Sequence, residues 1–439
     1  MRDANTWGVK NWLSFLAFLA LVLNAAADDA TRPLMHDFMG LNGHFAFKPD
    51  LYRPTCQLVR NYHSTVWDLG DNTSLPATFP LARNKVDWSV TYGAWKKGGF
   101  GIDSSLQIDS IPPAKWKNLD ADAQSYGEAF AKYFGPSSSD LVQSAEIGNE
   151  PANWDNANYA RLFKAMAAGL RAGDPKLKIV TAAASPEAKP DQYSKSVSVL
   201  DGMTDLYDVL NVHTYSFLEG WPTWRRVWPE HTDIPYLKVV QDMITWRDAH
   251  APGKEIWVTE FGYDAGTGKK GTGDFARWVG CSETEQAQWI VRSFLMLSSM
   301  DVRRAYLYFF DDRDEAQLHG ASGITRNFVP KPAYFAMAHL YQTLGDYRFS
   351  RIVKQDKDDL YIFEYVNPGK PKEPIWVAWS PTGTQREVER AIDVPGSIVK
   401  AERMPLKPGD APSVSIIVDA NTPQVPISES PVYLWLKLP

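Results

Sequence analysis

The chain has 439 residues, of which 44% are hydrophobic and 22% are charged. This length and composition predict a globular protein that is large enough for one big domain and a smaller second one. The formal net charge of −6 argues against nucleic acid or an anionic membrane surface as a partner, because both select for basic patches.

The N-terminus has the pattern of an export signal. Arg2 and Lys10 precede the apolar run WLSFLAFLALVL, and Ala25 to Ala27 offer a small-residue cleavage site before Asp28. The run is short for a membrane span, and no later segment approaches ~18 continuous apolar residues. We therefore predict a signal peptide over residues 1–27 and a secreted or periplasmic protein with no membrane partner after cleavage. A retained N-terminal anchor is the alternative.

Short apolar runs then alternate with helix-like segments over residues 28–343. The predicted strands are, in chain order, MGLNGHF, LVRNYHSTVWDL, FGIDSSLQI, LVQSAEIGNE, KIVTAAA, VLNVHTY, EIWVTEF and RAYLYFF. AQSYGEAFAKYF and YARLFKAMAAGLRAG, between the third and fifth strands, have the pattern of amphipathic helices. This alternation indicates a parallel sheet covered by helices. Eight strands fit an α/β fold of the (β/α)₈ barrel type better than an open sheet, and no Walker motif follows a strand.

The pattern changes near the end of the eighth repeat. From 344 to 439 the recognisable runs are all strand-like, and Pro- and Gly-containing turns separate them. They predict a small all-β sandwich domain over residues 344–439. Trp376 and Trp379 are three residues apart, so in a strand they face opposite sides and cannot form one flat sugar platform without a bulge. We expect a structural domain packed on the barrel, and a sugar-binding module is the alternative.

Two glutamates end two of the predicted strands. Glu150 follows Asn149 at the end of the fourth strand, and Glu260 ends the seventh. Active sites of such barrels lie at the carboxyl ends of the strands, so both side chains are expected at one mouth. A protonated acid beside an ionised one is what glycoside hydrolysis needs, and their environments must separate their pKa values. One strand-end glutamate alone is more often a loop residue or a helix cap, but the pair favours catalysis.

Strict alternation along these strands makes further predictions. It places Glu146 inside the barrel below Glu150, and it puts Ile256, Val258 and Glu260 on one face. A buried acid needs a partner, and Arg60 on the second strand is the candidate partner of Glu146.

The chain resembles the clan A glycoside hydrolases. These are (β/α)₈ barrels with an acid/base in an Asn-Glu(-Pro) motif after strand four and a glutamate nucleophile after strand seven, and GNEP at 148–151 and TEFG at 259–262 match both motifs. The VRNYH strand and the C-terminal sandwich look most like family 39 and related bacterial polysaccharide hydrolases. The resemblance covers the barrel, and it implies a retaining mechanism with no cofactor and no metal.

The resemblance also implies a role for each matching residue. Glu150 would be the acid/base, Glu260 the nucleophile, and Asn149 the partner of the sugar 2-hydroxyl. Arg60 would hold Glu260 ionised, unless it is the partner of Glu146 alone.

The sixth predicted strand ends in HTY, and the resemblance places its side chains in the same pocket. Tyr215 would hydrogen-bond the nucleophile, and His213 would face the pocket beside it. The alternative for both residues is a packed strand end.

At the floor of the pocket, the sequence departs from the family pattern. Many clan members carry a tryptophan on strand eight as the floor of the central sugar site, whereas this strand reads RAYLYFFDD. Tyr308 or Phe310 is expected to replace that tryptophan. His44 and Trp67, near the ends of the first and second strands, are further candidate pocket residues.

An aromatic loop, SFLEGWPTWRRVWPEH, follows the sixth strand. It contains Trp221, Trp224 and Trp228, and aromatic faces stack on the apolar faces of sugar rings. We expect this loop to be a wall of the substrate cleft, and a flap that only packs on the protein is the alternative. The polar loop DDRDEAQLHGASG after the eighth strand is a candidate second wall.

The chain has two cysteines, Cys56 and Cys281, and no Cys-x-x-Cys spacing, which argues against a zinc site. A disulfide is compatible with export, but the two predicted positions are not obvious neighbours. We therefore predict two free thiols.

Together these features predict a retaining glycoside hydrolase that cleaves β-linked polysaccharide or oligosaccharide, acting within the polymer. An exo-β-glycosidase and a transglycosylase would use the same residues. A catalytically inactive carbohydrate-binding barrel is the alternative from another class. We expect a monomer that needs no cofactor.

Overall fold

The computed structural model describes residues 32–43, 48–187, 193–409, 412–419 and 422–439. The predicted signal peptide, residues 1–27, and the candidate pocket residue His44 lie outside the described residues. Within the described ranges, no helix combines the length and the apolar character that a membrane span requires.

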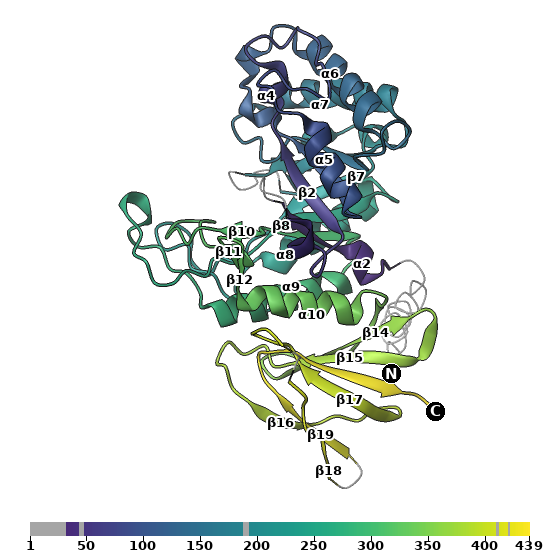
Figure 1. Cartoon of the computed structure of the whole chain (residues 1–439), viewed down its shortest axis with the longest axis vertical. Helices are drawn as coiled ribbons and strands as arrows, with labels where there is room; N and C mark the ends of the chain where they lie inside the picture. Colours follow the sequence, from purple (N-terminus) through teal and green to yellow (C-terminus); the bar gives the residue numbers. More distant parts are fainter. Residues whose placement is uncertain (1–31, 44–47, 188–192, 410–411, 420–421) are drawn as a thin grey trace, which may run out of the picture.

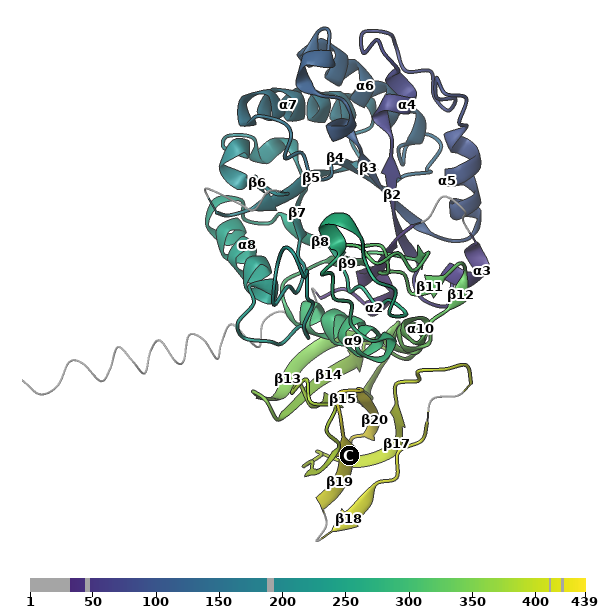
Figure 2. The ribbon, with the colours of Figure 1, turned by 90° about the vertical axis from the view of Figure 1, so that its left-hand side faces the viewer.

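Eight parallel strands close into a barrel, and Figure 2 looks into it. Each strand pairs with its neighbours in chain order, and the pairing of the last strand with the first closes the circle. The strands are β1 (Met39–Asn42), β2 (Leu58–His63), β3 (Gly101–Leu106), β4 (Ser144–Ile147), β5 (Lys178–Ser185), β7 (Val209–His213), β8 (Glu255–Phe261) and β9 (Arg304–Leu307). The predicted (β/α)₈ barrel is confirmed.

Helices surround the barrel (Figures 1 and 2). The longer ones are α5 (Trp88–Lys97), α6 (Leu119–Phe134), α7 (Asn156–Gly173), α8 (Tyr236–His250), α9 (Glu283–Ser299) and α10 (Pro332–Leu344). Short helices α2 (Met35–Phe38), α3 (Pro49–Tyr52) and α4 (Thr65–Leu69) complete the layer, and the two-residue strand β6 (Lys195–Ser196) pairs with the end of β5.

The second predicted strand is shorter than its apolar run. It ends at His63, and the residues that follow form α4. Asp68 of α4 binds the His63 imidazole at 2.7 Å, and Thr65 donates a hydrogen bond to the Gln107 carbonyl oxygen. These contacts fold the segment back against the barrel, so tertiary hydrogen bonds override its strand-like composition.

The lower part of the barrel interior is apolar. Five side chains from different strands pack there as one cluster, namely Leu58, Val180, Val209, Trp257 and Tyr306. The interior becomes polar and charged toward the carboxyl ends of the strands. A polar mouth above a packed floor is the arrangement expected where this fold carries an active site.

Strict alternation fails near the end of β8. Ile256 and Val258 pack in the outer core against the helices, and so does Phe261, which contacts Phe294 of α9 edge to face. The pairing of β8 with both neighbours shifts register after Val258. The prediction that Ile256 and Val258 share a face with Glu260 is therefore wrong, because the irregularity adds a residue and turns Glu260 toward the mouth.

A β-sandwich follows the barrel. The described elements after α10 are all strands, arranged in antiparallel sheets of five and three. They are β13 (Arg348–Asp356), β14 (Leu360–Asn367), β15 (Lys370–Trp379), β17 (Ser397–Arg403) and β20 (Val432–Lys437) in one sheet, and β16 (Val388–Ala391), β18 (Ile417–Asp419) and β19 (Thr422–Ile427) in the other. The predicted all-β sandwich is confirmed.

The two tryptophans of β15 face opposite sides, as predicted. Trp376 is buried within the sandwich and donates a hydrogen bond to Glu364 at 2.8 Å. Trp379 is buried on the barrel side and donates a hydrogen bond to Glu230 at 2.7 Å. Neither ring is free to act as a flat sugar platform.

The sandwich packs on the barrel beneath α9 and α10 (Figure 1). Arg292 of α9 is fully buried at this interface. Its Nε donates to Glu230 Oε1 at 2.9 Å, and its Nη1 donates to Glu429 from the loop before β20. One buried cation therefore joins two carboxylates, one from the barrel and one from the sandwich.

Replacing Arg292 with leucine is expected to lower the free energy of unfolding by ~3–5 kcal/mol, because two buried carboxylates lose their counter-charge. Arg161→Ala is the matched control, since the pair of Arg161 with Asp120 is exposed and should contribute at most about 1 kcal/mol. Urea unfolding of the two variants measures both values. Equal losses would contradict the structural role of the buried network.

Both cysteines are free thiols, as predicted. Burial raises the pKa of the Cys56 thiol to about 12, and burial also raises the pKa of Cys281. Neither thiol is therefore activated for chemistry near neutral pH.

Candidate active site

The structure brings Glu150 and Glu260 together at the barrel mouth, with His213 between them. His213 Nδ1 lies 2.8 Å from Glu150 Oε1 and 3.7 Å from Glu260 Oε2. One ligand atom from each of the three side chains lies within 4.8 Å of the others, a spacing that a metal ion could also use. Arg60, 2.9 Å from Glu260, already supplies a positive charge there.

A tight turn aims the Asn-Glu pair. β4 ends at Ile147, and Gly148 has a φ of +93°, a region that favours glycine. After this turn both following side chains face the mouth. Asn149 Oδ1 accepts a hydrogen bond from Arg60 Nη2 at 2.8 Å, and Glu150 contacts His213.

Glu260 is held by three hydrogen bonds. Tyr62 Oη donates to Oε1 at 2.6 Å, Arg60 Nη1 donates to Oε1 at 2.9 Å, and Tyr215 Oη donates to Oε2 at 2.8 Å. Burial opposes ionisation, but the charges of His213 and Arg60 and the two tyrosine hydrogen bonds outweigh it. They lower the pKa of Glu260 to about 2, so this carboxylate is ionised across the physiological range.

Arg60 links the nucleophile candidate to the barrel interior. It is fully buried, and its Nε and Nη2 donate to Glu146 at 2.9 and 2.6 Å. Nη1 donates both to Glu260 and to Asn42 Oδ1 at 2.9 Å. Arg60 therefore binds Glu146 and Glu260 at the same time, and it is not the partner of Glu146 alone.

A second interior acid lies behind this group. Burial, followed by the nearby charge of Glu146, raises the pKa of Asp103 well above its ordinary value. Ser144 Oγ donates to Asp103 at 2.6 Å. Burial therefore disfavours the ionised form of Asp103, and Arg60 is the cation bound to both Glu146 and Glu260.

His213 is 7% exposed and contacts polar groups through both ring nitrogens. Its Nδ1 faces Glu150, and its Nε2 lies 3.0 Å from Thr259 Oγ1. Burial disfavours the charged ring, but the negative charge of Glu260 and the contact with Glu150 outweigh burial and raise the pKa of His213.

Tyr62 and His319 are site residues that the sequence did not predict. Tyr62 lies on the same face of β2 as Arg60, so alternation along the strand could have found it. His319 comes from the loop after β10 (Asp311–Asp312), and its ring lies 4.7 Å from that of Tyr215 and 5.3 Å from that of Tyr308. Burial and the nearby charge of Arg226 lower the pKa of His319 to about 4.

The two candidates for the sugar floor have different positions. Tyr308 lies beside the site, with its ring edge-to-face with Tyr62 at 6.3 Å. Phe310 is fully buried and stacks on Tyr52 of α3 at 3.7 Å, so its prediction as a sugar platform is wrong. The chain turns away from the mouth after β9 and carries this ring into the core.

Trp67 lies on α4, in the helix layer. Its ring stacks on Trp88 of α5 at 5.7 Å, and Trp88 in turn stacks on His63, which faces outward from β2. The structure therefore places Trp67 in the packing outside the barrel rather than among the residues around Glu260.

The aromatic loop after β7 divides into an exposed and a packed part. Trp221 is 69% exposed, whereas Trp224 is half-buried and packs on Phe217 at 5.5 Å. The ring of Trp228 lies directly against Gly383 of the sandwich. The prediction that all three form a cleft wall is wrong for Trp228, because this ring is part of the interface between the two domains.

Connections after β8 and β9 project from one side of the barrel (Figure 1). They include a small sheet of β10, β11 (Thr325–Arg326) and β12 (Val329–Pro330). Arg226 is buried beneath these loops, with its guanidinium 4.7 Å from the Tyr215 ring centroid and bonded to Asp264 at 3.0 Å. This contact supports the Tyr215 ring, whose hydroxyl donates to Glu260.

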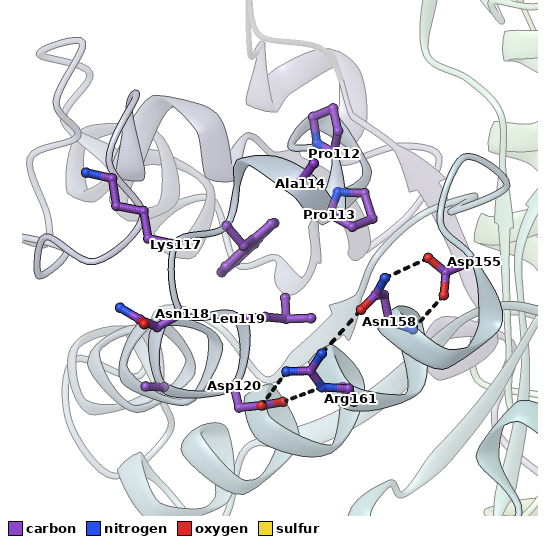
Figure 3. Close-up of a pocket in the computed structure, with 12 residues that line it drawn as sticks. Pro112, Pro113, Ala114, Lys117, Asn118, Leu119, Asp120, Asp155, Asn158 and Arg161 are labelled. Atoms are coloured by element: carbon purple, nitrogen blue, oxygen red, sulfur yellow. Dashed lines mark hydrogen bonds and ion pairs between the residues drawn. The ribbon is translucent and has the colours of Figure 1, made fainter.

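A hollow of about 850 Å³ lies beside the Glu150 loop (Figure 3). Its lining comes from the connection between β3 and α6 and from the first turns of α6 and α7, which begin at the mouth end of the barrel. Pro112, Pro113 and Leu119 form its apolar part, while Asp155 and Arg161 bring charge to its edge.

Removing the hydroxyl of Tyr62 or Tyr215 is expected to raise the pKa of Glu260. Hydrogen bonds to a charged group typically amount to ~1.5–3 kcal/mol, so each Tyr→Phe change should move the acidic limb of kcat/KM to higher pH by roughly one to two units. Tyr365→Phe is the control, because it removes a buried tyrosine bond to Ser298 at the sandwich interface.

The direction of this shift of the acidic limb follows from the depressed pKa of Glu260. Its ionised form contributes to both activity and stability above its ordinary pKa, and that contribution is lost as pH falls through about 2. Without one tyrosine bond the loss begins at higher pH. Rate measurements from pH 2 upward test this, and unchanged acidic limbs in both active-site variants would contradict the hydrogen-bond account.

No protein-family model matches this sequence, and no curated protein is similar to it in sequence. The fold, however, is similar to solved structures of glycoside hydrolases. A family 39 glycoside hydrolase from the gut symbiont Bacteroides cellulosilyticus is 17% identical, with 92% of this chain and 81% of that chain covered and a TM-score of 0.70. A glucosidase from Croceicoccus marinus is 13% identical, with 94% and 97% covered and a TM-score of 0.61.

A family 30 endoxylanase from Clostridium papyrosolvens is similar as well. It is 14% identical, with 93% of this chain and 97% of that chain covered and a TM-score of 0.56. These three similarities extend over both the barrel and the sandwich. The chain therefore has the fold of clan A glycoside hydrolases, as its sequence resemblance predicts.

Proposed function

We propose that this protein is a retaining glycoside hydrolase in which Glu260 is the nucleophile and Glu150 the general acid/base. The observation that carries the proposal is the pair of carboxylates at the mouth, with oxygens within 4.8 Å of each other. Retaining enzymes hold their carboxyl groups ~5–5.5 Å apart, whereas inverting enzymes need ~6.5–9.5 Å to admit a water molecule. The short gap favours direct attack by a carboxylate.

The different surroundings of the two acids support these roles. Glu260 accepts three hydrogen bonds, and its side chain is 7% exposed. Glu150 contacts His213, and its side chain is 25% exposed. The ionised, rigidly held acid suits a nucleophile, and the more accessible acid suits exchange of a proton with a leaving group and then with water.

In the first step Glu260 attacks the anomeric carbon while Glu150 gives its proton to the glycosidic oxygen. The C–O bond breaks, and a glycosyl ester of Glu260 remains. Arg60 and Tyr62 bind one oxygen of the attacking carboxylate and Tyr215 binds the other, so little reorganisation is needed. Asn149 would bind the 2-hydroxyl of the sugar, with its own orientation fixed by Arg60.

In the second step a water molecule attacks the same carbon from the side that the leaving group vacated. Glu150, now ionised, takes the proton of this water, and the ester bond to Glu260 breaks. Two displacements restore the original configuration. A sugar hydroxyl in place of the water would give transglycosylation.

The shape around the mouth supports an extended, β-linked substrate. The general acid stands beside the leaving group, so the leaving part of the substrate lies on the side of Glu150. Trp221, on the loop after β7, offers an exposed stacking face. Cleavage within a chain therefore fits better than removal of single terminal sugars.

Product analysis over β-glucans, xylans, mannans and algal galactans tests the function and the cleavage mode. Early release of mixed oligosaccharides would support internal cleavage, release of one small sugar would support an exo-glycosidase, and longer products would support transglycosylation. Binding without any cleavage would instead favour the inactive carbohydrate-binding alternative. Glu260→Ala protein serves as the control for contaminating activity.

Trp221→Ala is expected to weaken binding of long oligosaccharides more than short ones. Base–aromatic stacking contributes ~1–3 kcal/mol per contact, so a loss of roughly 5- to 140-fold in affinity is the upper range for a sugar. Trp246→Ala is the matched control, since this half-exposed ring stacks on His250 on the outer helix α8. Calorimetric titration measures both, and equal affinity of wild type and Trp221→Ala would remove this loop from the binding site.

We also propose that the protein is exported. The pattern of Arg2, the apolar run and the alanines before Asp28 supports this. N-terminal sequencing of the mature protein should begin near Asp28, and a retained Met1 in an exported form would indicate an anchor instead.

A further inference from the structure

A chain of buried side chains leads from the barrel interior to Glu150. Asn211 on β7 and Thr259 on β8 are both fully buried. Thr259 Oγ1 donates to Asn211 Oδ1 at 2.6 Å, and His213 Nε2 lies 3.0 Å from the same Oγ1. The other ring nitrogen of His213, Nδ1, lies 2.8 Å from Glu150 Oε1.

The direction of these hydrogen bonds determines the tautomer of the histidine. A threonine hydroxyl has one hydrogen, and here it is used in the bond to Asn211, because an amide oxygen can only accept. His213 Nε2 must therefore be the donor and carry a hydrogen. In the neutral ring, Nδ1 then has a lone pair that faces Glu150, and their contact is a hydrogen bond only when a proton lies between them.

We propose that Thr259 and Asn211 are positioning residues that fix His213 in its Nε2–H form, so that His213 Nδ1 and Glu150 share the proton given to the leaving group. This inference rests on the proposed function, because it identifies where that proton is held before the reaction. The catalytic acid is then a pair of groups with one exchangeable proton.

The proton balance is complete in both steps. As the glycosidic C–O bond breaks and the Glu260 ester forms, the shared proton goes to the leaving oxygen. Glu150 is left ionised beside a neutral His213 that keeps its Nε2 hydrogen. When water attacks and the ester bond breaks, the proton of that water returns to the pair, and Glu260 recovers its charge.

The charges that face His213 explain why its tautomer must be fixed by neutral groups. Glu150 and Glu260 both favour a charged ring, whereas Arg60 opposes it. His319, which lies near Tyr215, is held neutral by burial and by the charge of Arg226. Thr259 and Asn211 carry no charge. They therefore determine which ring nitrogen of His213 holds the hydrogen without changing the net charge around the ring.

Nitrogen NMR of the full chain labelled with ¹⁵N-histidine tests the tautomer directly. The chain has eight histidines, and the His213 signals are identified by their loss in His213→Gln. We expect Nε2 to stay protonated throughout a pH titration while Nδ1 gains and loses its proton. A neutral ring with its hydrogen on Nδ1 would overturn the proposal. The measurement needs no turnover, so failure to cleave any sugar would end the proposed function but leave this result readable.

Two variants test the effect on the reaction. Thr259→Val keeps the shape but removes the hydroxyl, and we expect the alkaline limb of kcat/KM to fall by roughly one to two pH units because the charged ring loses an acceptor. Thr259→Ser keeps the hydroxyl and should behave like wild type. Asn211→Leu frees the Thr259 hydrogen to bond Nε2, so the neutral ring should move to the Nδ1–H form.

Thermal unfolding shows whether each variant is folded. If Thr259→Val is folded and keeps the wild-type pH profile, the positioning role is wrong. If Thr259→Val does not fold, Asn211→Leu and the NMR titration of the wild type still test whether Thr259 and Asn211 fix the tautomer of His213. A wild-type tautomer in a folded Asn211→Leu variant would likewise overturn the proposal.

Discussion

Glu260→Ala is expected to lower kcat by roughly 10⁴- to 10⁶-fold, because removal of a catalytic nucleophile leaves only binding and the remaining polar groups to act on the substrate. The loss should appear in kcat far more than in KM, since the attacking carboxylate acts in the transition state. Initial rates on the substrate found by product analysis measure it.

The matched control is Glu255→Ala. Glu255 begins the same strand, β8, at the opposite end of the barrel, where it pairs with Lys178 at 2.5 Å. Its removal should leave kcat nearly unchanged. If Glu260→Ala retained wild-type kcat, or if Glu255→Ala lost as much activity, Glu260 would not be the nucleophile.

Azide gives a second readout for the Glu260→Ala variant. A small anion can enter the space left by the carboxylate and attack an activated aryl glycoside from that side. The expected product is a glycosyl azide of inverted configuration, because only one displacement occurs. A product of retained configuration would instead indicate that the vacated side is not where the nucleophile stands.

Glu150→Ala should fail in a different way. Loss of general acid catalysis is expected to slow natural substrates by ~10²- to 10⁴-fold. Substrates with a good leaving group need no proton, so they should still form the Glu260 ester and then stall, because no base activates water. Mass spectrometry should find the sugar on the peptide that contains Glu260, and azide should release a product of retained configuration. Fast, complete hydrolysis of the same glycoside by Glu150→Ala would exclude this role.

The barrel and the carboxylate pair could be predicted from the sequence because both depend on local patterns. Apolar strands alternate with amphipathic helices, and each acid directly follows such a strand. Gly148 and the Asn-Glu pair are adjacent in sequence, so the turn that aims Glu150 is encoded locally. Arg60 and Tyr62 share a face of β2, and alternation alone therefore locates both.

Other features depend on contacts that sequence spacing does not specify. The register shift in β8 arises from pairing with both neighbouring strands, so the orientation of Glu260 could not be obtained from alternation. Phe310 lies beyond the end of β9, where alternation no longer says which way a side chain points. Trp228 has its partner, Gly383, in the other domain, and the sequence gives no sign of that contact.

The position of His319 is a further case of this kind. It comes from a loop whose path depends on the small sheet of β10, β11 and β12, and no motif marks it. Its ring nevertheless packs against Tyr215 and Tyr308 beside the nucleophile. Polar loops after the last barrel strand can therefore complete a site whose main residues are evident from the strands.

The most direct measurement of the central claim is the anomeric configuration of the first product, followed by ¹H NMR from the earliest time points of hydrolysis by the wild-type protein. If Glu260 attacks the sugar and Glu150 then activates water, the new reducing end appears first in the β configuration and reaches the equilibrium mixture only later by mutarotation. An α product at the earliest time points would mean a single displacement by water, and it would contradict the assignment of Glu260 as the nucleophile.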